Sequence, residues 1–212
     1  MFKIAGSTRA SGQELGHPSG AWQNAGMGRR AGNLSVYEQR LDVPDHLIAE
    51  IIRGVLVTQP RPAARHARAA TRLGSALAPF DIAGAATPGG WIILIEPELH
   101  LGPDILVPDL AGWRRSRMAE LPDVTAFELA PDWVCEVVSP STAALDRTDK
   151  MPIYGSAGVG HAWLVDPLAQ TLEVFRRDAA LWILLDGFKG QARVRAEPFD
   201  ALELDLTLLW AR

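Results

Sequence analysis

The chain has 212 residues, of which 48% are hydrophobic, so a single domain can bury a sizeable core. Its formal net charge of −4 does not by itself indicate a nucleic-acid binder. With one cysteine, Cys135, the chain can form neither an intramolecular disulfide nor a four-cysteine zinc site, and we interpret Cys135 as a small core residue. No apolar window long enough for a membrane span and no signal peptide are found, so we expect a cytoplasmic protein.

Residues 1–33 differ in composition from the rest of the chain. They are rich in Gly, Ser, Ala, Gln and Asn and have no lasting apolar period, so we expect a disordered N-terminal extension. Met27 is an alternative to Met1 as the start of translation. Residues 34–212 are expected to form a single domain.

The first ordered elements are predicted near Asp45. This residue could cap a short helix over residues 46–49, followed by a hairpin over residues 50–57 that turns at Arg53-Gly54. The next helix is predicted over residues 62–77. Its apolar face is expected to comprise Ala67, Ala70, Leu73 and Leu77, and its basic face to comprise Arg61, Arg65, Arg68 and Arg72.

Short apolar or alternating runs then predict successive strands over residues 91–95, 98–101 and 105–107. Pro108 cannot donate to a sheet ladder, so Asp109 is expected at a strand edge or bend, where it can face a cleft. The strongest strand is predicted over residues 131–138. Val134, Glu136 and Val138 share one of its faces, and Trp133, Cys135 and Val137 share the other.

A helix is predicted through Asp146, Lys150 and Tyr154. Ser141 or Thr142 is its candidate cap, and glycines at 155, 158 and 160 are expected to end it. Further strands are expected over residues 161–165, 171–176 and 181–185, and a last short element over residues 199–210. This order predicts an α/β fold with a mixed central β-sheet flanked by helices.

Asp109 and Glu136 form the candidate catalytic pair. A buried, unpaired carboxylate in mid-strand is costly, and two neighbouring carboxylates repel each other. Mg²⁺ or Mn²⁺ held by both would remove the conflict, polarise a phosphate and lower the pKa of a bound water. Lys150 could assist that water, or could be a surface lysine paired with Asp146. Glu50 could add a carboxylate to the cleft or face solvent.

The segment from Arg53 to Arg72 contains five arginines and no acid. Such a segment could meet the phosphate backbone of DNA, but a solvated helix face explains it equally well. The residues that we single out for nucleic-acid contact are Arg65, His66, Arg68 and Arg72.

Several motifs resemble the Uma2 family of endonucleases, which look like restriction endonucleases of the PD-(D/E)XK superfamily. The resemblance spans roughly residues 40–210, and its most specific runs cover residues 136–142 and 163–167. Further matching residues are Glu50 through Leu56, His66, Pro108-Asp109-Leu110, Asp146, Lys150, Tyr154 and Gly158-Val159. The resemblance implies a four-stranded mixed sheet core with Asp109 and Glu136 as metal ligands.

The chain departs from the wider nuclease pattern at Val138, where a lysine would be expected two positions after Glu136. Such folds can supply the lysine from the adjacent helix, and Lys150 is the candidate. Related nucleases often act as dimers, so the resemblance leaves a homodimer open.

The leading hypothesis is a metal-dependent endonuclease that hydrolyses DNA phosphodiester bonds. One alternative is a catalytically inactive nuclease fold that serves as a nucleic-acid or protein interaction module. Another is a metal hydrolase that acts on a small phosphoester. No element with base-reading geometry is evident, so the sequence indicates no target site.

Overall fold

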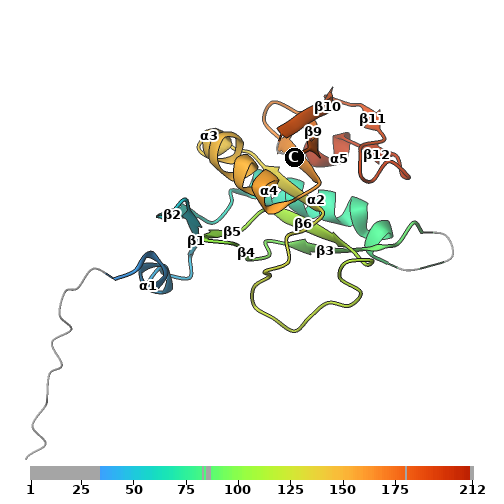
Figure 1. Ribbon diagram of the computed structural model, residues 1–212. Helices are drawn as coiled ribbons and strands as arrows, with labels where there is room; N and C mark the ends of the chain where they lie inside the picture. Colours follow the sequence, from blue (N-terminus) through green and yellow to red (C-terminus); the bar gives the residue numbers. More distant parts are fainter. Residues whose placement is uncertain (1–33, 83, 85–86, 180, 211–212) are drawn as a thin grey trace, which may run out of the picture. The chain divides into compact units, whose positions relative to one another are not determined.

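The computed structural model describes residues 34–210, except residues 83, 85–86 and 180 (Figure 1). The extension predicted over residues 1–33 lies outside the described residues. Within the described part of the chain, no helix combines the length and the apolar character needed to cross a membrane.

The start of the domain differs from the prediction. A helix, α1 (Val36–Leu41), comes first and is closed by a capping box between Ser35 and Glu38. Of residues 46–49, predicted to be helical, His46 lies in a turn and the rest belong to strand β1 (Leu47–Ile52), which pairs antiparallel with β2 (Val55–Pro60). The predicted turn at Arg53-Gly54 is confirmed, and both residues have positive φ. The register set by that turn pairs all of β1 with β2, from Ile52 opposite Val55 to Leu47 opposite Pro60, so residues 47–49 hydrogen-bond across the hairpin and not within a helix.

The described strands form more than the one sheet that was predicted. A four-stranded sheet has the order β2-β1-β5-β4 and includes β4 (Leu99–Leu101) and β5 (Asp104–Leu106). A six-stranded mixed sheet has the order β10-β9-β8-β7-β6-β3, and its only parallel pair among the described strands is β7–β8. Its members are β3 (Trp91–Ile95), β6 (Leu110–Arg114), β7 (Trp133–Val137), β8 (His161–Asp166), β9 (Thr171–Asp178) and β10 (Leu181–Lys189). The mixed central sheet flanked by helices is confirmed, and with six strands it is larger than the four-stranded core that the resemblance implies.

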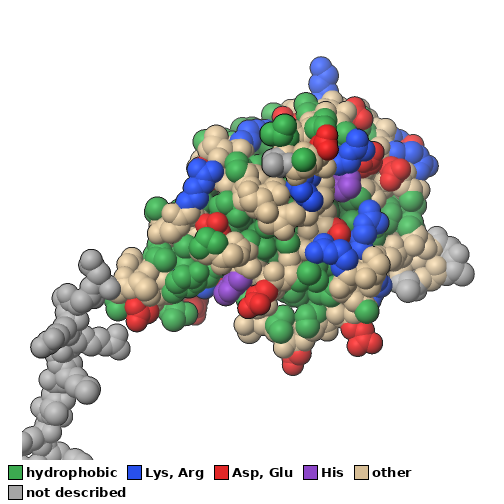
Figure 2. Space-filling model, in the orientation of Figure 1, with side chains coloured by type: hydrophobic (Ala, Val, Ile, Leu, Met, Phe, Trp, Pro, Cys, Tyr) green, Lys and Arg blue, Asp and Glu red, His purple; other side chains and the backbone are tan. Residues whose placement is uncertain are grey.

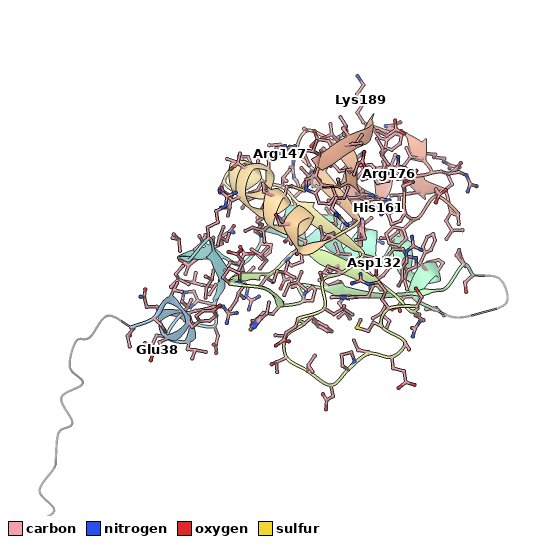
Figure 3. The ribbon with its side chains drawn as sticks, in the orientation of Figure 1. Glu38, Asp132, Arg147, His161, Arg176 and Lys189 are labelled. Atoms are coloured by element: carbon pink, nitrogen blue, oxygen red, sulfur yellow. The ribbon has the colours of Figure 1, made fainter. Side chains whose placement is uncertain are left out.

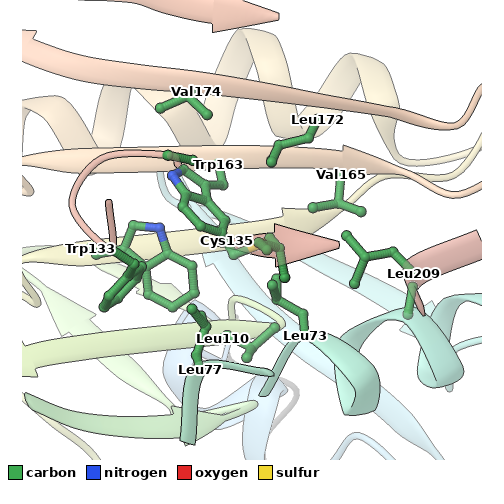
Figure 4. Packing of buried hydrophobic residues seen from close by; sticks show 14 of the residues in the cluster. Leu73, Leu77, Leu110, Trp133, Cys135, Trp163, Val165, Leu172, Val174 and Leu209 are labelled. Carbon is green, nitrogen blue, oxygen red and sulfur yellow. The ribbon is translucent and has the colours of Figure 1, made fainter. Parts of the chain in front are cut away.

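The two faces of β7 carry two separate cores, as the alternation in its sequence predicted. Trp133, Cys135 and Val137 face a cluster that includes residues of helix α2 (Ala64–Asp81), as Figure 4 shows for Leu73 and Leu77. The same cluster holds the C-terminal elements β11 (Arg193–Val194), β12 (Leu204–Asp205) and α5 (Thr207–Trp210). Within α2, the predicted apolar face is confirmed at Ala70, Leu73 and Leu77, but Ala67 is exposed and Ala69 is buried in its place.

On the other face of β7, Val134 and Val138 pack against the helical segment that follows the strand and against the four-stranded sheet. This segment runs through α3 (Ala143–Leu145), a π-helical turn η1 (Asp146–Lys150) and α4 (Met151–Ala157). Gly158 ends it with φ 93°, but Gly155 lies inside α4. There the absence of a side chain lets the Trp182 indole approach, because a Cβ would lie 3.1 Å from its Nε1.

Candidate active site

A cleft of about 280 Å³ lies where the two large sheets meet the N-terminal end of α2 and the η1 turn. All four predicted catalytic side chains line it: Glu50 from β1, Asp109 from the bend before β6, Glu136 from β7 and Lys150 from η1. The structure therefore brings together residues that lie up to 100 positions apart in the sequence. Asp146 lines the same cleft and makes a fourth carboxylate.

Lys150 lies between three of these carboxylates. Its Nζ is 2.9 Å from Glu50 Oε1, 3.3 Å from Glu136 Oε1 and 3.7 Å from Asp146 Oδ1. The residue is only 3% exposed, so the alternative of a surface lysine is wrong, although its pairing with Asp146 is present. Burial alone would lower the pKa of Lys150, but the three carboxylates outweigh burial and raise the pKa above its ordinary value. Lys150 therefore stays an ammonium ion at neutral pH.

Glu136 is held at one of its two carboxylate oxygens. Oε1 accepts a 2.6 Å hydrogen bond from the Tyr154 hydroxyl as well as the contact from Lys150. Burial raises the pKa of Glu136 well above its ordinary value; Lys150 opposes this shift, and the neighbouring carboxylates add to it. Burial and the charge of Glu136 also raise the pKa of Tyr154, so its hydroxyl keeps its proton.

Asp109 is fixed by contacts from two elements. Its Oδ2 accepts a 2.7 Å hydrogen bond from the Val137 amide, and its Oδ1 contacts His66 Nε2. The amide bond ties the bend before β6 to the end of β7, next to Glu136. His66 was singled out for nucleic-acid contact, but within the described structure its ring nitrogen meets a carboxylate of the site.

Glu50 has a similar anchorage, although solvent exposure had been an equal alternative. It is 1% exposed, and its Oε1 accepts a 2.8 Å hydrogen bond from the Val107 amide. Its Oε2 accepts a hydrogen bond from Gln59 Nε2 at 3.2 Å. Because Val107 lies two residues before Asp109, this bond places β1 beside the bend that carries Asp109.

The cleft holds more negative than positive charge. Four carboxylates line it together with the Lys150 ammonium and the Arg61 guanidinium, and the donors are hard oxygen atoms of the kind that Mg²⁺ and Mn²⁺ prefer. Within the described residues, no three His, Cys, Asp or Glu side chains are grouped closely enough to enclose an ion by themselves. Magnesium usually keeps several waters and takes only one or two carboxylates, so the residues present fit such an ion.

The remaining residues predicted to contact nucleic acid lie outside the cleft. Arg65, Arg68 and Arg72 are exposed on α2, whose first turn reaches the cleft at His66. Arg61 lines the cleft itself and pairs with Glu96 at 3.2 Å. On the face seen in Figure 2, basic and acidic side chains are interspersed and form no continuous basic surface.

Sequence reasoning had not assigned a role at the site to Tyr154, Gln59 or Asp146. Spacing offered a signal for two of them, because Asp146, Lys150 and Tyr154 follow at intervals of four and can share one helix face. Gln59 gave no signal, since its contact with Glu50 depends on the hairpin register. The π-helical turn was also unforeseen, and such turns are frequent at functional sites.

A family model described as "putative restriction endonuclease" matches residues 35–208, which is most of the chain. The chain belongs to the Uma2 family. Among solved structures, this Uma2 chain is similar to a crystal structure described as a "putative nuclease belonging to DUF820" from Anabaena variabilis. The two share 23% identity and a TM-score of 0.66, over 84% of this chain and 97% of the other, which establishes a common fold. No curated protein matches the sequence.

Proposed function

We propose that this Uma2 protein is an endonuclease that hydrolyses DNA phosphodiester bonds with Mg²⁺ or Mn²⁺. The observation that carries the proposal is the convergence of Glu50, Glu136 and Asp146 on a buried lysine, with Asp109 lining the same open cleft. A surplus of buried carboxylate is unfavourable unless a cation joins it. Membership of the Uma2 family supports a nuclease as the class of enzyme.

Asp109 and Glu136 would hold the ion, which supplies Lewis-acid polarisation of the scissile phosphate and lowers the pKa of an attacking water. The Val137 amide orients the Asp109 carboxylate, and Tyr154 and Lys150 orient that of Glu136. Because Lys150 keeps its proton, it acts as a hydrogen-bond donor to water or phosphate and not as a general base. Glu50 keeps the ammonium in place.

The arginines of α2 provide a path for the phosphate backbone that leads to the cleft. Arg65, Arg68 and Arg72 recur at helical spacing along the exposed side of α2, beginning beside the cleft residue His66. Arginine binds phosphate with planar, bidentate hydrogen bonds, without regard to base sequence. Replacing these arginines is therefore expected to weaken binding of all DNA sequences alike and to reduce the salt dependence of binding.

The test is cleavage of supercoiled plasmid and of single-stranded DNA with Mg²⁺, Mn²⁺ or EDTA. Asp109→Asn and Lys150→Met should each abolish metal-dependent cutting. Two matched controls should cut at the wild-type rate. Asp104→Asn changes a buried aspartate outside the cleft, and Lys189→Met changes an exposed lysine that projects from the end of β10 (Figure 3). Full activity in Lys150→Met would refute the role of the helix lysine, and cutting in EDTA would refute metal dependence.

One observation favours the alternative of a catalytically inactive interaction module. Both oxygens of Asp109 are already engaged by described groups, His66 and the Val137 amide, so the carboxylate also serves as a structural link. If the protein is an inactive interaction module, the wild type binds no Mg²⁺ or Mn²⁺ in calorimetry and cuts no DNA. It would still retain DNA in a filter or polarisation assay, and that retention would be lost in a triple Arg65, Arg68 and Arg72 to Ala variant.

A further inference from the structure

Tyr154 lies behind the cleft and contacts one of the acids that line it, Glu136. Its side chain is fully buried in the core between the two large sheets, yet its hydroxyl donates to Glu136 Oε1 at 2.6 Å. A tyrosine hydroxyl can equally pair with a backbone carbonyl, as that of the exposed Tyr37 does. The Tyr37 hydroxyl donates to Pro103 O at 3.2 Å, away from the cleft.

The two oxygens of Glu136 have unequal surroundings. Oε1 receives both Tyr154 and Lys150, whereas the described residues supply no hydrogen bond to Oε2. The other two principal carboxylates differ, since Asp109 and Glu50 each have both oxygens engaged. Among these three acids, Glu136 is thus the one with an oxygen that receives no hydrogen bond from a described residue. Each Asp109 oxygen has one described partner and keeps a second lone pair for a cation.

From this asymmetry we infer that Tyr154 is a positioning residue, which fixes the Glu136 carboxylate so that Oε2 is available to the divalent cation. The inference rests on the proposed metal-dependent function and deepens it. Lys150 and Tyr154 lie four residues apart on one continuous helical segment, so their two donors reach the same oxygen from one side. Without the hydroxyl, the carboxylate can rotate about its terminal bond, and Lys150 can then bridge both oxygens.

The decisive variant is Tyr154→Phe, which keeps the buried ring and removes only the hydroxyl. Tyr37→Phe is the matched control, because the chain has two tyrosines and this second one lies outside the cleft. Loss of an outer partner of a metal ligand typically weakens metal binding by about 10- to 100-fold. We expect that loss for Mn²⁺ by calorimetry without DNA, together with a matching rise in the Mn²⁺ concentration that gives half-maximal cleavage. The maximal rate at saturating Mn²⁺ should change much less.

A second measurement does not depend on how well Tyr154→Phe folds. The wild-type protein labelled with 3-fluorotyrosine should give two fluorine resonances, which Tyr37→Phe assigns. Titration with Mg²⁺ should shift the Tyr154 resonance and leave the Tyr37 resonance in place.

The outcomes separate the two proposals. If the wild type binds and uses metal but Tyr154→Phe binds Mn²⁺ equally well, or if Mg²⁺ moves neither resonance, the positioning role is overturned and the nuclease stands. If the wild type binds neither ion, both proposals are overturned. A lower stability of Tyr154→Phe with unchanged metal affinity would assign the hydroxyl a structural role only, and would also overturn the inference.

Discussion

Replacing Lys150 by Met tests whether the cleft is held together by one buried positive charge. The substitution keeps an unbranched side chain of similar length and removes the ammonium that lies 2.9 Å from Glu50 and 3.3 Å from Glu136. These partners are almost completely buried, so breaking the cluster leaves carboxylates without a counter-charge and with little exposure to solvent. Breaking a buried pair typically costs about 3–5 kcal/mol.

The cost of protonating a carboxyl group gives a second estimate of this loss of stability. The variant can avoid an unpaired charge by binding one extra proton on a carboxyl group, whose ordinary pKa is 4.5. At about pH 7.5 that proton must be taken up about three pH units above this value, at about 1.4 kcal/mol per unit, which amounts to about 4 kcal/mol. At about pH 5.5 the same step costs only about 1.4 kcal/mol.

The sign of the pH dependence follows from proton linkage. A carboxyl whose pKa rises on folding binds more protons in the folded than in the unfolded state. Its stability contribution therefore falls as the pH rises above 4.5 toward the raised pKa. The pKa of Glu136 is already raised in the wild type, so that shift is common to both proteins. The difference in unfolding free energy between variant and wild type therefore reports only the extra proton that the variant binds. That difference should grow by about 1.4 kcal/mol per pH unit.

The assay is urea unfolding followed by tryptophan fluorescence in EDTA, at several pH values between about 5.5 and 7.5, with the exposed Lys189→Met as control. A loss that is equal at both ends of this range would refute the reasoning. So would a loss below about 1 kcal/mol at the upper end, which is the size expected for a surface ion pair.

Three other predictions follow from the described contacts. Gly112→Ala should destabilise the protein by about 1–3 kcal/mol in urea unfolding, because a Cβ there lies 3.2 Å from the Trp133 ring and 3.3 Å from the Trp91 ring; an unchanged midpoint would contradict this packing. Metal binding should release protons and tighten as the pH rises, because Glu136 has a raised pKa and must lose its proton to bind a cation; calorimetry in buffers of different ionisation enthalpy measures the release, and buffer-independent heats would disprove it. Cys135 is fully buried with a raised pKa, so a thiol reagent should modify it only after unfolding; rapid labelling of the native protein would show that this core opens.

Local patterns in the sequence predicted most individual elements. The alternation along β7 correctly divided its side chains between two cores, and the Arg53-Gly54 turn correctly located the first hairpin. The capping box at Ser35 was a readable signal for α1 that was missed. The division into two large sheets was not predictable in this way, because it depends on which strands pair, and β1 pairs with β5 far along the chain.

The site was predictable as a set of residues but not as an arrangement. Chemistry nominated Asp109 and Glu136, since two acids on strand ends suit phosphodiester hydrolysis with a metal ion. It left Lys150 open, and the resemblance to the Uma2 family favoured it. Their partners depend on three-dimensional register. The Val137 amide reaches Asp109 because β6 and β7 pair antiparallel, and Gln59 reaches Glu50 because of the hairpin. Neither contact can be predicted from spacing along the sequence.

The position of the lysine on a helix has a physical reason in this fold. Val138, two residues after Glu136, is 2% exposed and belongs to the apolar cluster that packs under α4. An ammonium ion at that position would be buried among hydrocarbon groups, at a large cost in solvation. Lys150 approaches Glu136 from η1 instead, where Glu50 and Asp146 also reach its Nζ. The charge is therefore supplied by the helical segment that also carries Tyr154. Any shift of the π-helical turn would move the ammonium and the tyrosine hydroxyl away from Glu136 together.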